Sequence, residues 1–376
     1  MDITPYLKLM ADKDASDLFF SVGAPVNIKI QGQTFPVGRE SLGPGAVHKL
    51  AYTMINEEKQ NIFARELELN FSYALNDVGR FRVNLYRQRG EVAMVVRYIK
   101  SRIPTIEELK MPEVLKQLIM EARGLILVVG ATGSGKSTTL ASMIDYRNSN
   151  RSGHILTIEE PVEFVHHHKK SIVDQREIGV DTLSYASALK NAMREAPDVI
   201  LIGEIRDRET MQHAIAYAET GHLCISTLHA NNANQAIDRI INFFPESAHH
   251  QLLIDLSLNL QAVISQRLIR SKDGTRVPAV ELMLKSPHIS DLIGKREIDL
   301  LKEAIEKSRD AGMQTFDQSL IDLYMQGIIT REDALHNADS RTNLALRMRL
   351  TGRGDDDEED QNDDATGGLT LDLRDD

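Results

Sequence analysis

The stretch Gly130-Ala-Thr-Gly-Ser-Gly-Lys-Ser137 decides the fold class of this 376-residue chain. It fits the pattern Gly-x4-Gly-Lys-Ser, in which glycines let backbone N–H groups converge on phosphate oxygens. An apolar run at Leu125–Val129 precedes the loop, and a helical pattern from Lys136 to Tyr146 follows it. A helix N-terminus at that point favours anions. The stretch therefore predicts a phosphate-binding loop between a strand and a helix, against the weak alternative of a chance Gly/Ser-rich turn.

The loop predicts which residues hold the phosphates of a nucleoside triphosphate and its accompanying Mg²⁺. We expect Lys136 to reach the β- and γ-phosphates and Ser137 to ligate Mg²⁺. The full set of expected cofactor-binding residues is Gly130, Thr132, Gly133, Ser134, Gly135, Lys136, Ser137 and Thr138.

Strand-like runs recur outward from this loop. Further apolar runs at His154–Ile158, Val199–Ile202 and Leu223–Thr227 alternate with helical patterns. This alternation predicts an α/β domain with a parallel sheet. From about Glu246 the pattern favours helices, with a short strand at Val277–Met283.

The first hundred residues predict a separate small α+β domain. Val26–Ile30, Arg80–Tyr86 and Ala93–Ile99 have strand patterns, and His48–Glu66 has a helical one. Two prolines in Ser101–Pro112 indicate a linker. The expected organisation is a domain at 1–100, a linker at 101–112, an ATPase domain at 113–353 and an acidic tail at 354–376 that we predict to be disordered.

Charge and cysteine content exclude several classes of protein. The net charge is −11, and residues 355–376 alone hold eleven acidic residues and one arginine, which leaves −1 for the remainder. A nearly neutral body disfavours a nucleic-acid-binding protein with a large basic surface. The single cysteine, Cys224, excludes an intrachain disulfide and a four-cysteine zinc site. Charged residues near the start and short apolar runs predict a cytoplasmic protein that associates with membranes only through partners.

Two acidic segments follow predicted strands. Val199-Ile-Leu-Ile-Gly-Glu204 ends an apolar strand in a carboxylate suited to hold Mg²⁺, directly or through water. Thr157-Ile-Glu-Glu-Pro-Val-Glu163 clusters three carboxylates at a turn, where one of them is placed to act as a general base on water. From spacing alone, a solvated acidic turn is the stronger interpretation of the second segment.

Histidines and arginines supply further candidates. His222 and His229 bracket a strand, and a position at its end suits a sensor of the γ-phosphate. The run 166–168 of three histidines predicts an exposed loop rather than a metal site. Arg82 and Arg97 belong to an arginine-rich part of the first domain, and such side chains either stabilise transition-state charge from a neighbouring domain or are simply solvated.

Together these segments resemble the type II/IV secretion ATPase superfamily. The matching stretches, in family order, are Ala15-Ser-Asp-Leu18, GATGSGKSTTLA from Gly130, HILTIEEPVEFVH from His154, REAPDVILIGEIRD from Arg194 and TGHLCISTLHANNA from Thr220, with Gly312-Met-Gln-Thr315 near the end. The match extends over roughly residues 1–350 and is most similar to the PilT/PilU group of type IV pilus retraction ATPases.

The resemblance implies a fold, an activity and roles for residues. It implies a PAS-like N-terminal domain, a RecA-like P-loop ATPase domain, a homohexameric ring and ATP hydrolysis that powers pilus retraction. Carried over to this chain, Glu163 is the catalytic base, Glu204 the Mg²⁺-associated acid, and His222 and His229 the sensors. Arg82 and Arg97 are the arginines that close on ATP. An inner-membrane pilus platform protein is the implied partner, and the implied location is the cytoplasmic base of the pilus.

Departures from the typical pattern separate the branches of the superfamily. The lack of a four-cysteine module excludes the assembly and secretion branch. Glu160 stands where the typical retraction ATPase has Asp, and the segment His288–Ile293 lacks an expected arginine. The acidic tail favours the PilU side, which implies an accessory motor working with a PilT-like ATPase. The alternatives left open are a nucleotide-binding accessory subunit without its own turnover and a RecA-like DNA motor.

Overall fold

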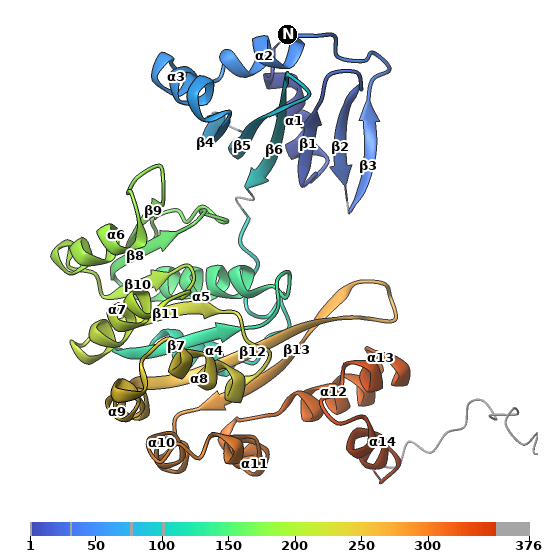
Figure 1. Cartoon of the computed structure of the whole chain (residues 1–376). Helices are drawn as coiled ribbons and strands as arrows, with labels where there is room; N and C mark the ends of the chain where they lie inside the picture. The colour runs from blue at the N-terminus through green and yellow to red at the C-terminus, as the bar shows by residue number, and fades with distance from the viewer. Residues whose placement is uncertain (1, 31, 76–77, 100–101, 351–376) are drawn as a thin grey trace, which may run out of the picture.

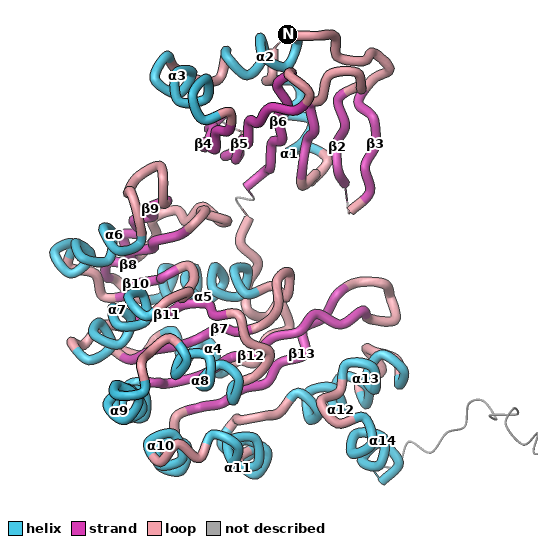
Figure 2. Tube along the Cα trace, in the orientation of Figure 1, coloured by secondary structure: helices cyan, strands magenta, loops and turns pink. Residues whose placement is uncertain are grey.

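A computed structural model describes residues 2–30, 32–75, 78–99 and 102–350 of the chain. These residues form two units, each built on its own sheet (Figures 1 and 2). The expected acidic tail at 354–376 lies outside the described residues, as does residue 101 of the expected linker.

The first unit is a six-stranded antiparallel sheet with helices on one face. The strand order is β3-β2-β1-β6-β5-β4. Side chains of the three helices and of one sheet face form a core that includes Leu7, Leu50, Phe63, Phe81 and Met94. The elements are α1 (Thr4–Asp12), β1 (Asp17–Phe20), β2 (Val26–Ile30), β3 (Gln33–Val37), α2 (Ala46–Tyr52), α3 (Glu57–Glu66), β4 (Glu68–Leu75), β5 (Gly79–Gln88) and β6 (Glu91–Ile99).

The second unit is a seven-stranded sheet in the order β13-β12-β7-β11-β10-β8-β9. Every neighbouring pair is parallel except the β12–β13 hairpin, which confirms the predicted α/β class. The strands are β7 (Gly124–Val129), β8 (Gly153–Glu159), β9 (Ser171–Glu177), β10 (Val199–Ile202), β11 (Leu223–Leu228), β12 (Leu260–Arg270) and β13 (Arg276–Leu284).

Strand β7 lies inside this sheet, and all six of its residues are buried. Leu125 and Leu127 pack into the core on one face, whereas Ile126 and Val128 pack into the core on the other. Burial on both faces explains why a continuous apolar run, without alternation, precedes the phosphate-binding loop. The segment 102–112 adds Ile106 and Met111 to the second of these cores.

Helices cover both faces of the second sheet and continue beyond it (Figure 1). Among the described residues, no helix is both long and apolar enough to cross a membrane. The helical elements are α4 (Val114–Ile119), α5 (Lys136–Asn150), α6 (Tyr185–Ala192), η1 (Met193–Glu195), α7 (Arg208–Glu219), α8 (Ala233–Asn242), η2 (Glu246–Ala248), α9 (His249–Asn259), α10 (Pro287–Gly294), η3 (Ile298–Leu300), α11 (Leu301–Lys307), η4 (Arg309–Ala311), α12 (Phe316–Met325), α13 (Arg331–Asn337) and α14 (Arg341–Leu350).

One expectation about local structure is wrong, and one strand was not expected. The helix expected at His48–Glu66 is two helices, because the Asn56 side chain accepts a hydrogen bond from the Lys59 amide and begins α3 afresh. The region after Glu246 is mostly helical and contains the expected strand at Val277–Met283 as β13, but it also contains the unexpected eleven-residue strand β12. This strand is buried along most of its length, so it lacks the alternation by which sequence separates a strand from a helix.

Candidate active site

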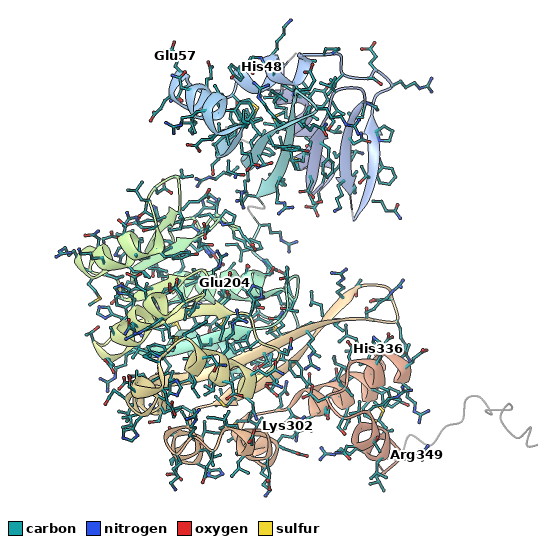
Figure 3. All side chains as sticks on the ribbon, in the orientation of Figure 1. His48, Glu57, Glu204, Lys302, His336 and Arg349 are labelled. Carbon is teal, nitrogen blue, oxygen red and sulfur yellow. The ribbon has the colours of Figure 1, made fainter. Side chains whose placement is uncertain are left out.

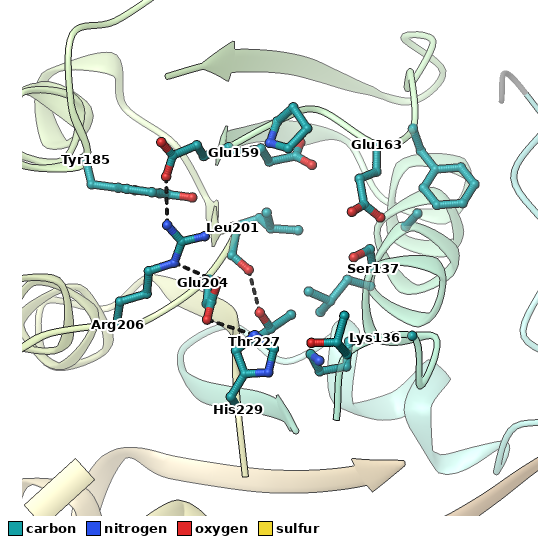
Figure 4. A pocket seen from close by; sticks show the side chains of 18 of the residues that line it. Lys136, Ser137, Glu159, Glu163, Tyr185, Leu201, Glu204, Arg206, Thr227 and His229 are labelled. Carbon is teal, nitrogen blue, oxygen red and sulfur yellow. Dashed lines mark hydrogen bonds and ion pairs between the residues drawn. The ribbon is translucent and has the colours of Figure 1, made fainter. Parts of the chain in front are cut away.

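The expected chemical residues gather at one edge of the second sheet. Strands β7, β8, β10 and β11 are parallel, so their carboxyl ends lie on the same side. Beyond these ends come the phosphate-binding loop, the acidic segment at 159–163, Glu204 and His229. These segments line one hollow (Figure 4). In Figure 3, Glu204 lies in the body of the second unit, away from Lys302 and His336 on the C-terminal helices.

The phosphate-binding loop has the backbone that its glycines permit. Gly130, Gly133 and Gly135 have φ values of 155°, 78° and 92°, which favour glycine over other residues. Strand β12 also approaches closely: a Cβ on Gly130 would lie 2.5 Å from the Gln266 carbonyl oxygen. The Gln266 side chain accepts a hydrogen bond from Thr139 Oγ1 at 2.8 Å. The loop is therefore braced from the neighbouring strand.

The loop fits a phosphate ligand. Lys136 is buried, and its Nζ donates to the carbonyl oxygens of Gly130 and Ala131, both at 2.9 Å. Burial lowers the pKa of Lys136, while the nearby carboxylates of Glu204 and Glu163 raise it. The Ser134 hydroxyl is buried without a hydrogen-bond partner among the described residues. An ammonium resting on its own loop and an unsatisfied hydroxyl suit a cradle that an anion completes.

Glu204 stands at the centre of a polar network. One carboxylate oxygen accepts from Arg206 Nε at 2.8 Å, and the other lies 3.1 Å from His229 Nε2. Arg206 also contacts Glu160 at 3.0 Å. The Thr227 hydroxyl donates to the Gly203 carbonyl at 2.7 Å, which ties the ends of β10 and β11 together. The structure thus brings the expected Glu204 and His229 into direct contact.

The acidic segment places two different carboxyl groups on the pocket wall. Glu163 lies beside Ser137 in Figure 4, and its carboxylate has no hydrogen-bond partner in the part of the chain that the structure describes. Glu159, by contrast, accepts from Thr157 Oγ1 at 2.7 Å and from Gln175 Nε2 at 3.2 Å. Burial raises the pKa of Glu159 to about 7. Glu163 is therefore available as a base, whereas Glu159 is held and partly protonated near neutral pH.

This raised pKa leads to a prediction about stability. The Glu159 carboxyl keeps its proton up to about pH 7 in the folded chain, but releases it near its ordinary pKa of 4.5 in the unfolded chain. The folded chain therefore binds the extra proton between these values, and its stability falls as pH rises through that window. Glu159→Gln removes this dependence. The free energy of unfolding of the variant, relative to that of the parent, is therefore expected to be about 2 kcal/mol higher at pH 8 than at pH 5. Urea unfolding of the nucleotide-free protein at both pH values measures the difference, and an equal difference at both would contradict it.

Some histidines lie elsewhere than expected. His222 precedes β11, and its carbonyl accepts from the Gly124 amide at the start of β7. Strand β11 separates it from His229 by about 20 Å, so the two histidines lie at opposite ends of the strand. His222 is therefore outside the pocket. In the 166–168 run only His167 and His168 are exposed. His166 is buried on the pocket wall, where burial lowers its pKa to about 4. Within the described ranges, no group of three or more His, Cys, Asp or Glu side chains is arranged so that it could hold a metal ion.

Arg82 and Arg97 lie on the first unit, next to the pocket. They are partners across β5 and β6 and line an interdomain hollow together with Thr138, Glu163 and Phe164. Arg97 Nε donates to the buried Asp17 at 2.9 Å, which fixes its direction. Both expected arginines therefore border the acidic segment, and among the described residues neither forms an ion pair with it.

Several pocket residues were missed by sequence reasoning. Tyr185 and Thr227 line the wall, Gln266 braces the loop, and Gln175 holds Glu159. Gln175 and Gln266 lie on β9 and β12, strands that the sequence pattern did not predict.

Comparisons with known proteins agree with this site. A family model described as "Type II/IV secretion system protein" matches residues 64–334. A Pseudomonas aeruginosa protein named "Type IV pilus ATPase PilU" is 50% identical over 377 residues, which is 100% of this chain and 98% of that protein. The same organism's "Type IV pilus retractation ATPase PilT" is 45% identical over 338 residues, or 90% of this chain and 98% of that protein.

Solved structures extend the likeness to three dimensions. A crystal structure of the pilus retraction motor PilT with bound ADP has a TM-score of 0.85 and 42% identity, covering 92% of this chain and 99% of that one. The Yersinia pseudotuberculosis ATPase DotB has a TM-score of 0.74 and 26% identity, covering 91% and 92%. These likenesses confirm the resemblance drawn from the motifs. The chain therefore belongs to the type II/IV secretion system protein family, and within it to the PilT/PilU group.

Proposed function

We propose that this chain is an ATPase that hydrolyses ATP with Mg²⁺ in a hexameric ring and so powers type IV pilus retraction. The observation that carries the proposal is the single sheet edge at which Lys136, Ser137, Glu163 and Glu204 meet. The likeness to PilU and PilT over nearly the whole chain supplies the link to the pilus.

In this proposal each pocket residue has a role. The loop from Gly130 to Thr138 binds the phosphates through its backbone, and the Lys136 ammonium turns from its own carbonyls to the β- and γ-phosphates. Glu163 accepts a proton from the attacking water, and His229 senses the γ-phosphate through its contact with Glu204. His222 has no place in the pocket of its own chain.

The charge of the pocket supports Mg²⁺. Four carboxyl groups (Glu159, Glu160, Glu163 and Glu204) line it, whereas Lys136 and Arg206 are its permanent cations. A polyphosphate entering alone would meet repulsion from the carboxylates, so a divalent cation between the two is favoured. Ser137 and, directly or through water, Glu204 are the residues that would hold it. When bound, Mg²⁺ neutralises charge on the phosphate oxygens.

The first unit completes the site in this proposal. Arg82 and Arg97 face the acidic segment from across the interdomain hollow. A small rotation of the first unit would carry these guanidiniums onto the phosphates, where arginine stabilises transition-state charge. Opening after phosphate loss would release them, so the chemistry and the domain motion are coupled.

We infer the location and the partners from the family resemblance. We place the chain in the cytoplasm, where ATP is available, peripherally at the inner-membrane base of the pilus. Its partners are five further copies, an inner-membrane platform protein and a PilT-like retraction ATPase that it assists. No nucleic acid is a partner, because the expected body charge of −1 offers no large basic surface.

Steady-state phosphate release from ATP tests the enzymatic part of this proposal. The purified protein with Mg²⁺ is expected to turn over, and Glu204→Ala is expected to reduce the rate to the buffer blank. Removing Mg²⁺ with EDTA should stop the parent reaction. Bound ATP without turnover in the parent would instead favour an accessory subunit that is active only with its partner ATPase. Absence of nucleotide binding would overturn the site itself.

A further inference from the structure

The acidic segment is held in place by an edge strand that carries none of the expected chemical residues. Strand β9 is the last strand of the second sheet and pairs with β8, from whose end the segment runs. Gln175 on β9 accepts from the His166 amide at 2.8 Å. Its Nε2 donates to the Phe164 carbonyl at 2.9 Å and to Glu159. One side chain thus fixes both ends of the segment that carries Glu163.

Glu177, two residues further along β9, holds the middle of the same segment. Its side chain is buried, with 5% of the residue exposed. One carboxylate oxygen accepts from the Val162 amide at 3.3 Å, directly before Glu163. The other oxygen accepts from Ser72 Oγ at 3.2 Å. Ser72 belongs to β4 of the first unit, so a single buried carboxylate joins the acidic segment to the other domain.

Ser72 moves with the arginines that the proposed function needs. It is the cross-strand partner of Arg82, which in turn is the partner of Arg97. The three residues form one row across β4, β5 and β6, and such a row moves as a unit because the ladder hydrogen bonds fix its register. In Figure 1, β9 lies on the side of the second unit that is nearest to β4. A movement that draws the arginines away from the hollow therefore also draws Ser72 away from Glu177.

We propose that Glu177 is a positioning residue that couples the placement of the first domain to the acidic segment. With the first domain in place, Ser72 and the Val162 amide share the Glu177 carboxylate, and Glu163 is held toward the phosphates. When the first domain moves away, the buried carboxylate loses one of its two partners, and the segment loosens. The role of this coupling in catalysis rests on the proposed function, whereas the hydrogen-exchange experiment below does not depend on it.

The loss of one partner matters because the group is charged and buried. A hydrogen bond to a charged group contributes more than one between neutral groups, and a buried carboxylate left short of donors is unfavourable. We therefore expect the adjacent turn to rearrange when the Glu177 carboxylate loses the hydrogen bond from Ser72. Three of these four side-chain hydrogen bonds from β9 end on backbone atoms, and the fourth ends on Glu159, so a change at Glu177 is transmitted mainly through the backbone.

Amide hydrogen exchange of residues 160–166 in the nucleotide-free protein tests the coupling without requiring turnover. Ser72→Ala removes only the hydroxyl and is expected to accelerate exchange in this segment about ten-fold. Glu177→Gln should have a similar effect, and the double variant should add little to either single change. The matched control is Asn70→Ala, two residues earlier on the same strand face, where the side chain accepts a hydrogen bond from Asn84 and, among the described residues, from no residue of the second unit. That control should leave exchange unchanged.

Turnover gives a second measurement in the active protein. Ser72→Ala is expected to lower kcat about ten-fold while KM for ATP stays within about two-fold, and Ser72→Thr, which keeps the hydroxyl, should restore the rate. Exchange at the parental rate in Ser72→Ala, or equal acceleration by Asn70→Ala, would overturn the coupling. A parent protein without turnover would overturn the proposed function alone, since the exchange experiment still decides this inference.

Discussion

Lys136→Ala is expected to lower ATP turnover by at least about 1,000-fold. The side chain is the one buried ammonium that lines the described pocket, and two loop carbonyls hold it where the β- and γ-phosphates would lie. Burial lowers its pKa, but the nearby carboxylates of Glu163 and Glu204 favour its charged form. Removing it leaves those carboxylates facing the incoming phosphates without the adjacent counter-charge. Both nucleotide affinity and turnover should therefore fall, as measured by fluorescent-nucleotide titration and phosphate release.

A matched variant separates this effect from a change in net charge. Lys190→Ala removes the same charge from an exposed position on α6, away from the pocket, and should leave turnover within about two-fold of the parent. Near-ultraviolet circular dichroism of Lys136→Ala should match the parent, because the loop is also braced by Gln266. Parental turnover in a folded Lys136→Ala would refute the assignment of the phosphate-binding loop.

The sequence alone could predict those parts of the site that consecutive residues form. The phosphate-binding loop needs a strand, glycines and a helix N-terminus in succession, so Lys136 and Ser137 follow from local pattern alone. Glu204 follows in the same way, because a buried strand ending in an acid is a local signal. The parallel α/β class also followed, since four apolar runs alternate with helical patterns.

Sequence reasoning failed where a residue acts through a partner distant in the chain. Gln266 lies 127 positions from Thr139, and Ser72 lies 105 positions from Glu177. Polar side chains on β9 and β12 give no signal until the sheet places them beside the loop. His222 shows a further limit: the resemblance gives it a sensor role together with His229, but the six-residue strand β11 lies between the two and holds them at opposite ends of the strand.

The arginines illustrate an intermediate case. Family resemblance selected Arg82 and Arg97, and the structure places both on the hollow that borders Glu163. Their common row across β5 and β6, and the ion pair that directs Arg97 toward Asp17, are tertiary facts that no local pattern contains. Sequence could therefore select these residues but could not orient them.

Glu163→Gln is expected to lower kcat by about 100- to 10,000-fold while leaving nucleotide affinity nearly unchanged. Glutamine keeps the size of the side chain but cannot accept a proton from water. The Glu163 carboxylate is suited to that role because none of the described residues donates a hydrogen bond to it, and it lies beside Ser137 on the pocket wall. Single-turnover phosphate release and nucleotide titration at saturating Mg²⁺ separate the chemical step from binding.

Glu159→Gln is the control that tests this choice of base, because both residues belong to the same acidic segment and line the same pocket. Glu159 already accepts hydrogen bonds from Thr157 and Gln175, and its pKa of about 7 leaves it partly protonated at neutral pH. A base in that state would produce a rate that rises with pH through 7 and is abolished by Glu159→Gln. If Glu163 is the base, Glu159→Gln should retain at least about a tenth of the parental kcat and flatten any rise near pH 7, whereas Glu163→Gln should be inactive throughout. The reverse pattern would transfer the role to Glu159 and leave Glu163 to position the water.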